Sequence, residues 1–206
     1  ITANGQNYTF DAVLYATGRK PNTANIGLEN TDITTNERGA IVVNDTCESS
    51  VPGVYAVGDV NGGPQFTYIS LDDFRIVFGA LTGNSQYTLK DRKNIPYTTF
   101  LTPPLARVGL TEEDAINKGY TVKTKEMLVA TMPRAHVNDY LKGAFKIVVD
   151  AENNLILGAT LYSQGAEELI NLIKMAMDNN IPYTYFKNQI FTHPTMAENL
   201  NDLCNF

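Results

Sequence analysis

The sequence is poor in cysteine and lacks long apolar runs, and each shortage excludes a class of protein. Cys47 and Cys204 are its only cysteines, and they stand too far apart for a Cys-x-x-Cys redox or zinc motif or a disulfide framework. We interpret both as thiols without a redox role, in a reducing cytoplasm. No apolar run reaches the length of a membrane span, and residues 1–5 lack the basic start and apolar core of a signal peptide. The expected location is therefore cytoplasmic.

Basic clusters are also missing. The net charge is −6, the isoelectric point is near 4.9, and lysine and arginine form no long run. Nucleic acids and anionic membranes bind basic surfaces, so we predict neither as a partner.

What the sequence does contain is an apolar content of 43% over 206 residues. This is enough for a core and leaves room for one large domain or two modest ones. The dipeptide Asn4-Gly5 predicts a hairpin within residues 1–10, and the apolar run of residues 10–16 predicts a buried strand. A hairpin and one strand cannot bury both faces, so we expect the chain to be cut from a longer sheet, with its true N-terminus missing.

Residues 53–59 combine a predicted strand with the dipeptide Gly58-Asp59, and a helix is expected from about Thr67 to Ala80. Further short strands are expected at residues 40–43, and no helix before residue 64. A glycine after a strand lets backbone approach a ligand, and an aspartate there accepts hydrogen bonds from ligand hydroxyls. The start of the helix favours an electron-rich ligand atom near Thr67. The alternative is an ordinary strand-loop-helix connection with Asp59 as a turn residue.

Residues 81–94 are polar and mark a boundary, so we expect a second domain from about Ile95. Its pattern predicts strands, a helix after Thr111 and a helix with a wide apolar stripe, in an α+β arrangement that can leave a helical face for a partner subunit. The expected extended runs cover residues 97–101, 121–131, 143–150 and 154–162, and the expected helices cover residues 111–119, 166–177 and a last stretch from Met196.

The segment from Phe191 to Glu198 contains the strongest candidate for a general acid/base. A proline follows His193 and disfavours a helical backbone there, so the imidazole should be exposed. Glu198 is placed to hydrogen-bond one ring nitrogen and fix the tautomer. The competing interpretation is a capping box, in which Thr195 and Glu198 satisfy backbone donors. The other histidine, His136, is expected to be a polar loop residue and no metal ligand.

Four short motifs stand in a recognisable order along the chain. They are Ala16-Thr17-Gly18-Arg19-x-Pro21-Asn22, Gly53-Val54-Tyr55-Ala56-Val57-Gly58-Asp59, Arg107-Val108-Gly109-Leu110-Thr111-Glu112 and His193-Pro194-Thr195-x-x-Glu198. Together they resemble the C-terminal half of flavoprotein disulfide reductases, the relatives of glutathione reductase, dihydrolipoamide dehydrogenase and mercuric reductase. The resemblance implies an α/β plus α+β fold: a truncated, Rossmann-like FAD/NAD(P)-binding portion followed by an α+β dimerisation domain.

The resemblance also implies domain limits and roles. Residues 1–20 would end the NAD(P)-binding domain, residues 21–94 would complete the FAD-binding domain, and residues 95–206 would form the dimerisation domain of a homodimer. Asp59 would hold the ribityl chain of FAD, with Gly58 allowing its approach. The pyrimidine edge of the flavin would lie at the helix start, formed by Gln65, Phe66 and Thr67. His193 and Glu198 would act across the dimer as an acid/base dyad on the redox disulfide of the other subunit.

Within this family, the segments 66–75 and 189–203 are most similar to bacterial reactive-chlorine-resistance flavoproteins, a group associated with hypothiocyanous acid and copper. Residues 132–135 are reminiscent of mercuric reductases, but Cys204 stands alone where those carry a cysteine pair. The chain has no Gly-x-Gly-x-x-Gly and no Cys-x-x-x-x-Cys, so most of the NAD(P)H site and the redox cysteines would lie outside it, and the chain alone should be inactive.

Three alternatives stay open at this point. The first is that residues 95–206 form a dimerisation module without chemistry. The others are a dihydrolipoamide dehydrogenase-like enzyme and a reductase of mercuric or copper ions. The leading hypothesis is a dimeric FAD enzyme that moves electrons from NAD(P)H through a cysteine pair to a disulfide or a small oxidant such as hypothiocyanous acid, with a role in cell redox homeostasis. The sequence selects neither NADH nor NADPH, and it does not identify the acceptor.

Overall fold

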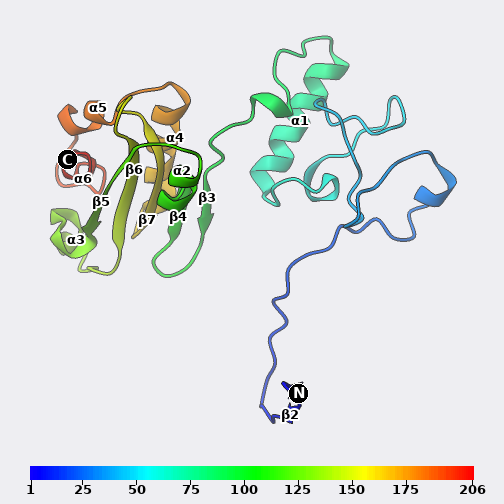
Figure 1. The fold of residues 1–206 in the computed structure, drawn as a ribbon, viewed down its shortest axis with the longest axis horizontal. Coiled ribbons are helices and arrows are strands. Elements are labelled where there is room, and N and C mark those ends of the chain that lie inside the picture. Colours follow the sequence, from blue (N-terminus) through cyan, green and yellow to red (C-terminus); the bar gives the residue numbers. More distant parts are fainter. The chain divides into compact units, whose positions relative to one another are not determined.

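The computed structural model describes all 206 residues, which divide into two compact units, Ile1–Asp91 and Arg92–Phe206. Across the chain, no helix combines the length and the apolar character that crossing a bilayer requires. The first unit is mostly loops around one helix, whereas the second is built on a sheet (Figure 1).

The first unit begins with the predicted hairpin. Strands β1 (Thr2–Ala3) and β2 (Gln6–Asn7) pair antiparallel, and Asn4 and Gly5 both take positive φ angles, 52° and 76°. Asparagine and glycine tolerate this backbone, which a two-residue hairpin turn requires. The strand predicted for residues 10–16 is wrong: the segment is exposed and has no strand structure. A strand is stable only with a pairing partner, and this segment has none in the chain.

The strands predicted at residues 40–43 and 53–57 are also wrong. Each is reduced to one isolated bridge, Thr35 with Ile41 and Glu48 with Tyr55. The turn between the two segments is closed by the side chain of Asn44, whose Oδ1 accepts the backbone N–H groups of Thr46 and Glu48, both at 3.0 Å. Local side-chain bonds of this kind compete with a strand ladder.

The helices of the first unit follow the expectation in outline. No α-helix precedes residue 64, although two 3-10 turns do, η1 (Leu28–Asn30) and η2 (Gly58–Asn61). Helix α1 (Thr67–Leu81) begins where predicted and buries Ile69, Asp73 and Ile76, which share one face. A further 3-10 turn, η3 (Leu89–Asp91), ends the unit.

The second unit contains a five-stranded antiparallel sheet. Its order is β3-β4-β7-β6-β5, and the strands are β3 (Tyr97–Thr99), β4 (Leu105–Gly109), β5 (Val122–Leu128), β6 (Ala144–Asp150) and β7 (Ile156–Tyr162). Four of the five match predicted extended runs. Strand β4 was missed, because five residues after two prolines, with an arginine in the middle, are too short to show a period of two.

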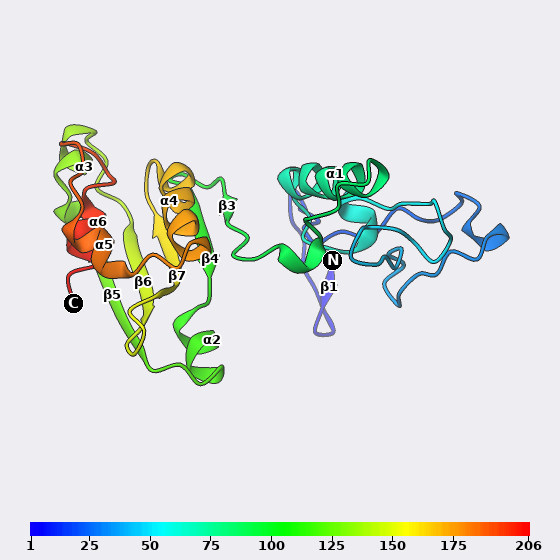
Figure 2. The ribbon, with the colours of Figure 1, turned by 90° about the horizontal axis from the view of Figure 1, so that it is seen from above.

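Helices cover one face of this sheet. Helix α4 (Ala166–Asp178) packs on β4 and β7, and α6 (Asn199–Leu203) packs on β5 and β6. The helical stripe predicted over residues 166–177 is confirmed, but it is buried on one side only, since Met175 keeps 56% of its surface exposed. The last helix begins at Asn199 and not at Met196. Helix α5 (Tyr183–Asn188) contacts α6, and Figure 2 shows α4, α5 and α6 in front of the strands.

Two short helices lie in the connections. Helix α2 (Glu112–Asn117) has the predicted cap: the Thr111 hydroxyl accepts the N–H of Asp114, and the Asp114 carboxylate accepts the N–H of Thr111. Helix α3 (Pro133–Val137) follows the 3-10 turn η4 (Val129–Thr131). His136 therefore lies in a helix and not in a loop, a correction that follows from proline being favourable at the first helical position.

Candidate functional site

The contact predicted between His193 and Glu198 is present. Nδ1 of His193 lies 2.7 Å from Oε2 of Glu198, and the two side chains are 68% and 19% exposed. An ionised carboxylate can only accept, so Nδ1 carries the proton of this bond. In the neutral ring the lone pair is then on Nε2, which has no hydrogen-bond partner within the chain. The imidazole is thus oriented by Glu198 and largely exposed to solvent.

The capping box is present as well, on the same carboxylate. Oε1 of Glu198 accepts the backbone N–H of Thr195 at 3.1 Å, and Oγ1 of Thr195 accepts the backbone N–H of Glu198 at 3.2 Å. The two interpretations of the motif are therefore compatible. One oxygen closes the turn and the other holds the ring.

The pKa of Glu198 lies below its usual value. The hydrogen bond from His193 is the main cause, and the N–H of Thr195 and the charge of His193 act in the same direction. Hydrogen bonds to the charged form of a carboxyl favour that form. Glu198 is therefore a stable acceptor for the imidazole at neutral pH.

Short polar contacts hold the turn that carries this pair. The peptide bond between His193 and Pro194 is cis, and the Thr195 hydroxyl donates to the carbonyl of Thr192 at 2.7 Å. Asn199 is buried and donates from Nδ2 to the carbonyls of Thr195 and Met196, at 3.2 and 3.1 Å. The backbone on both sides of Glu198 is thus fixed by side chains of the same segment.

The other predicted site lies in the first unit, where a buried carboxylate fixes the loop at Gly58. Asp73 of α1 accepts the N–H of Gly58 at 2.7 Å and the side-chain amide of Asn61 at 2.9 Å. Gly58 has a φ of 71°, and a Cβ there would lie 2.5 Å from Oγ of Ser70. Only glycine fits both the backbone angle and the space.

The neighbouring carboxylate is exposed and has a charged partner. Oδ2 of Asp59 lies 3.2 Å from Nη1 of Arg19, so the structure brings together two of the motifs noted in the sequence. Sequence reasoning missed this contact, for which the only signal was opposite charge in two turn-rich segments.

The start of α1 supplies the remaining residues predicted to bind a cofactor. Gln65 and Phe66 are half-buried and Thr67 is exposed. Phe66 has an extended backbone, its carbonyl accepts the N–H groups of Ile69 and Ser70, and its ring stacks on Tyr68 with centroids 5.1 Å apart. A helix of this length presents partial positive charge at its first turn.

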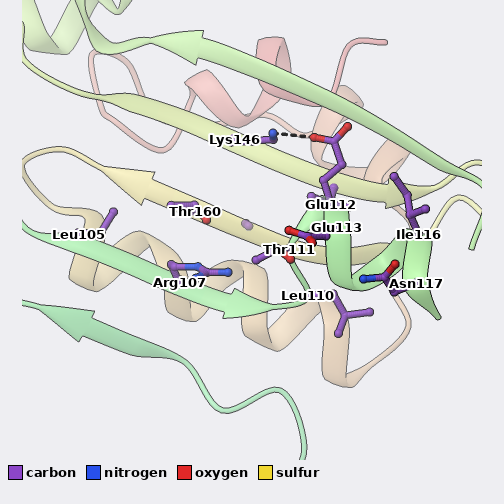
Figure 3. Close-up of a pocket in the computed structure, with 12 residues that line it drawn as sticks. Leu105, Arg107, Leu110, Thr111, Glu112, Glu113, Ile116, Asn117, Lys146 and Thr160 are labelled. Carbon is purple, nitrogen blue, oxygen red and sulfur yellow. Dashed lines mark hydrogen bonds and ion pairs between the residues drawn. The ribbon is translucent and has the colours of Figure 1, made fainter. Parts of the chain in front are cut away.

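A hollow of about 740 Å³ lies on the sheet face of the second unit (Figure 3). Arg107 and Thr160 project into it from β4 and β7, and an ion pair between Lys146 and Glu112, at 2.7 Å, closes one side. None of the predicted site residues lines it. No cluster of potential metal ligands occurs in the chain, and the Nε2 of His136 bonds the Ala130 carbonyl at 2.8 Å.

Neither cysteine is placed for redox chemistry. Cys47 and Cys204 are fully buried and form no disulfide. Burial raises the pKa of the Cys204 thiol to about 12, and a thiol that stays protonated at neutral pH is a poor nucleophile.

Each of the two units matches a family model of known proteins. Residues 95–204 match the dimerisation domain of pyridine nucleotide-disulphide oxidoreductases, and residues 1–73 match a second family model, described as pyridine nucleotide-disulphide oxidoreductase. The probable pyridine nucleotide-disulfide oxidoreductase RclA of Escherichia coli K12 is 49% identical over 94% of the chain and 44% of its own length. A mercuric reductase of Staphylococcus aureus is 36% identical over 97% of the chain and 37% of its own length.

Solved structures agree with these matches. The structure described as the HOCl-induced flavoprotein disulfide reductase RclA from E. coli matches with a TM-score of 0.89 and 48% identity, over 92% of this chain and 43% of that one. The predicted fold class, α/β plus an α+β dimerisation domain, is thereby confirmed. The chain spans less than half the length of the relatives that it matches.

Proposed function

The chain belongs to the pyridine nucleotide-disulphide oxidoreductase family, and we propose that it is the C-terminal part of a dimeric reductase. In that proposal, electrons pass from NAD(P)H through FAD and a cysteine pair, both held mainly by residues outside this chain, to a disulfide or small oxidant. The relatives are flavoproteins, mercuric reductases and dihydrolipoyl dehydrogenases. The observation that carries the proposal is the oriented, exposed imidazole of His193.

The residues of the first unit fit one part of FAD, its polyol and flavin edge. Gly58 has no side chain to block an approach, and the exposed carboxylate of Asp59 suits a row of hydroxyl donors. The start of α1, at Gln65, Phe66 and Thr67, would face the electron-rich edge of the ring. When bound, FAD supplies a two-electron carrier between the nicotinamide and the cysteines. When FAD binds, Arg19 would either give up its ion pair with Asp59 or keep it on the side of the carboxylate that faces away from FAD.

His193 would act on sulfur. Its Nε2 takes the proton from a cysteine thiol, which leaves a thiolate that attacks the sulfur of the disulfide or oxidant. The same nitrogen, now protonated, returns its proton to the leaving group, which is a thiolate sulfur for a disulfide and the hydroxide oxygen for hypothiocyanous acid. Glu198 keeps Nδ1 protonated through both steps and offsets the positive charge of the imidazolium. In the proposed homodimer, the cysteine pair belongs to the other subunit.

Hypothiocyanous acid is the oxidant that we propose, from the resemblance of segments 66–75 and 189–203 to reactive-chlorine-resistance flavoproteins. Mercuric ion is a weaker candidate, because Cys204 is buried and stands alone, so it cannot form a pair of thiol ligands at the surface. A dihydrolipoyl dehydrogenase-like activity and a reductase of copper ions remain alternatives, and a solved RclA structure is described as a Cu(II) complex. We further propose a cytoplasmic role in cell redox homeostasis.

A non-catalytic dimerisation module is the second candidate function. The match of residues 95–204 to a dimerisation domain and the capping box at Thr195 support it. The two candidates differ in what the imidazole does. In the dimerisation module, Glu198 serves only the capping box and His193 contributes nothing to turnover.

Replacing each of the two histidines in the full-length protein separates these candidates. His193→Ala should lower thiol-dependent turnover by about a hundredfold or more, the scale of a lost general acid/base. His136→Ala is the matched control, because that ring bonds only a nearby carbonyl, and its turnover should stay within about twofold. Equal turnover in the two variants would support the dimerisation module and overturn the reductase role of His193.

A further inference from the structure

The segment that carries His193 is a strap between two short helices. It runs from Gln189, just after α5, to Thr195, four residues before the start of α6. Ile190 within it keeps 95% of its surface exposed, so packing does little to hold that residue. Phe191 is half-buried and its ring stacks on Phe186, with centroids 6.5 Å apart, and the strap is otherwise held by hydrogen bonds at its two ends. The end near His193 is fixed by the bonds among Thr195 and Glu198 already described.

The other end is fixed by Asn201. Its side-chain Nδ2 donates to the carbonyls of Phe186 at 2.6 Å, Gln189 at 2.9 Å and Lys187 at 3.3 Å. These carbonyls belong to the last turn of α5 and the residue after it. The last carbonyls of a helix have no partner inside the helix, so one amide both caps α5 and holds the start of the strap.

Asn201 can do this because α6 itself is anchored. Leu200 and Leu203 are fully buried in the core. Nζ of Lys125, on β5, donates to the carbonyls of Asp202 and Asn205 at 2.7 and 2.6 Å, which satisfies the C-terminal end of the helix. Both ends of the strap are therefore tied to one fixed helix, by Asn201 at the start and by Glu198 at the end.

We propose that Asn201 is a positioning residue for His193. It touches neither the imidazole nor, in our assignment, any reacting atom, and it acts by restricting the strap. This inference rests on the proposed role of His193 as the base. Since an acid/base group loses rate steeply when its placement loosens, removal of the amide should lower kcat and leave the KM for the pyridine nucleotide unchanged.

The test uses two matched substitutions in the full-length protein, one within α6 and one two residues after its end. Asn201→Asp replaces the donors by oxygens that repel the three carbonyls. Asn205→Asp makes the same chemical change at an exposed side chain that has no hydrogen bond. We expect Asn201→Asp to speed amide hydrogen exchange across residues 189–195 and to lower kcat by about tenfold. Asn205→Asp should change neither. If Asn201→Asp fails to fold, Asn201→Ala carries the same expectation.

A double-mutant cycle separates positioning from general damage. With His193 already replaced by alanine, Asn201→Asp should cause no further loss of kcat, because it acts through that ring. A further tenfold loss in that background would overturn the inference, and so would unchanged exchange in the strap. Unaltered turnover in His193→Ala alone would instead overturn the proposed function, and the exchange comparison would still decide whether Asn201 holds the strap.

Discussion

Nδ1 of His193 lies 2.7 Å from Oε2 of Glu198, and the second oxygen of the same carboxylate closes the turn at Thr195. One side chain thus serves the backbone and the imidazole together. Loss of this carboxylate should therefore disturb both the turn and the ring. Its consequences for activity and for stability can be measured separately.

Replacing Glu198 by glutamine should reverse the tautomer of His193. The amide can donate to Nδ1, which places the ring proton on Nε2, the nitrogen that accepts the thiol proton in the proposed reaction. Turnover of the full-length protein should fall by about tenfold or more, as expected when a base is held in the wrong tautomer. Glu168→Gln, at an exposed position of α4, is the control and should keep wild-type turnover. Equal rates for the two variants would argue against an orienting role.

The contribution of Glu198 to stability should depend on pH in a defined direction. Its pKa in the folded chain is lowered from 4.5, chiefly by the hydrogen bond from His193. A carboxyl with a depressed folded pKa stabilises fully above its unfolded value, and the contribution is lost as the pH falls through the folded value. Urea unfolding should therefore show Glu198→Gln less stable than wild type at about pH 7, by a margin that shrinks as the pH falls through the lowered pKa of Glu198. A gap that widens in acid would contradict this assignment.

Two glycine substitutions in the first unit test the close packing at Gly58. Gly53 and Gly58 have similar positive φ angles, 79° and 71°, but a Cβ meets nothing within 4 Å at Gly53 and lies 2.5 Å from the Ser70 hydroxyl at Gly58. Gly53→Ala should cost about 1 kcal/mol of unfolding free energy from the backbone alone. Gly58→Ala should cost about 1–3 kcal/mol more, because the loop or Ser70 must shift. Equal losses would show that the loop has room.

The thiols should be inert in the folded chain. Cys47 and Cys204 are fully buried, and the pKa of Cys204 is raised to about 12. A disulfide reagent at neutral pH should label neither residue before unfolding, and both after it. Rapid labelling of Cys204 in the native chain would return a metal-ion reductase with a reactive C-terminal cysteine to consideration.

The parts of the fold that could be predicted from the sequence are those set by local geometry. The hairpin at Asn4-Gly5 depends on two backbone angles, and α4 depends on a regular apolar stripe that includes Leu169 and Ile173. Strand β4 was not predicted, because its stability comes from pairing on both sides, for example Ala106 with Leu161. The failed strand at residues 10–16 shows the converse, since its apolar pattern finds no partner.

The candidate site divides in the same way. His193 and Glu198 are five residues apart, so a turn alone brings them together. Arg19 and Asp59 are 40 residues apart, and Asn201 bonds carbonyls 12 to 15 residues away. Contacts of that separation depend on how loops and helices pack, which no local pattern specifies.

Mixed dimers of the full-length protein test the central claim, that His193 serves a cysteine pair on the other subunit. One subunit would carry His193→Ala with its cysteines intact, and the other would carry serine in place of the redox cysteines with His193 intact. If the base acts across the dimer, the mixed dimer contains one complete site and should show about half of wild-type turnover, although each parent homodimer is nearly inactive. Turnover no higher than that of the parents would contradict the account.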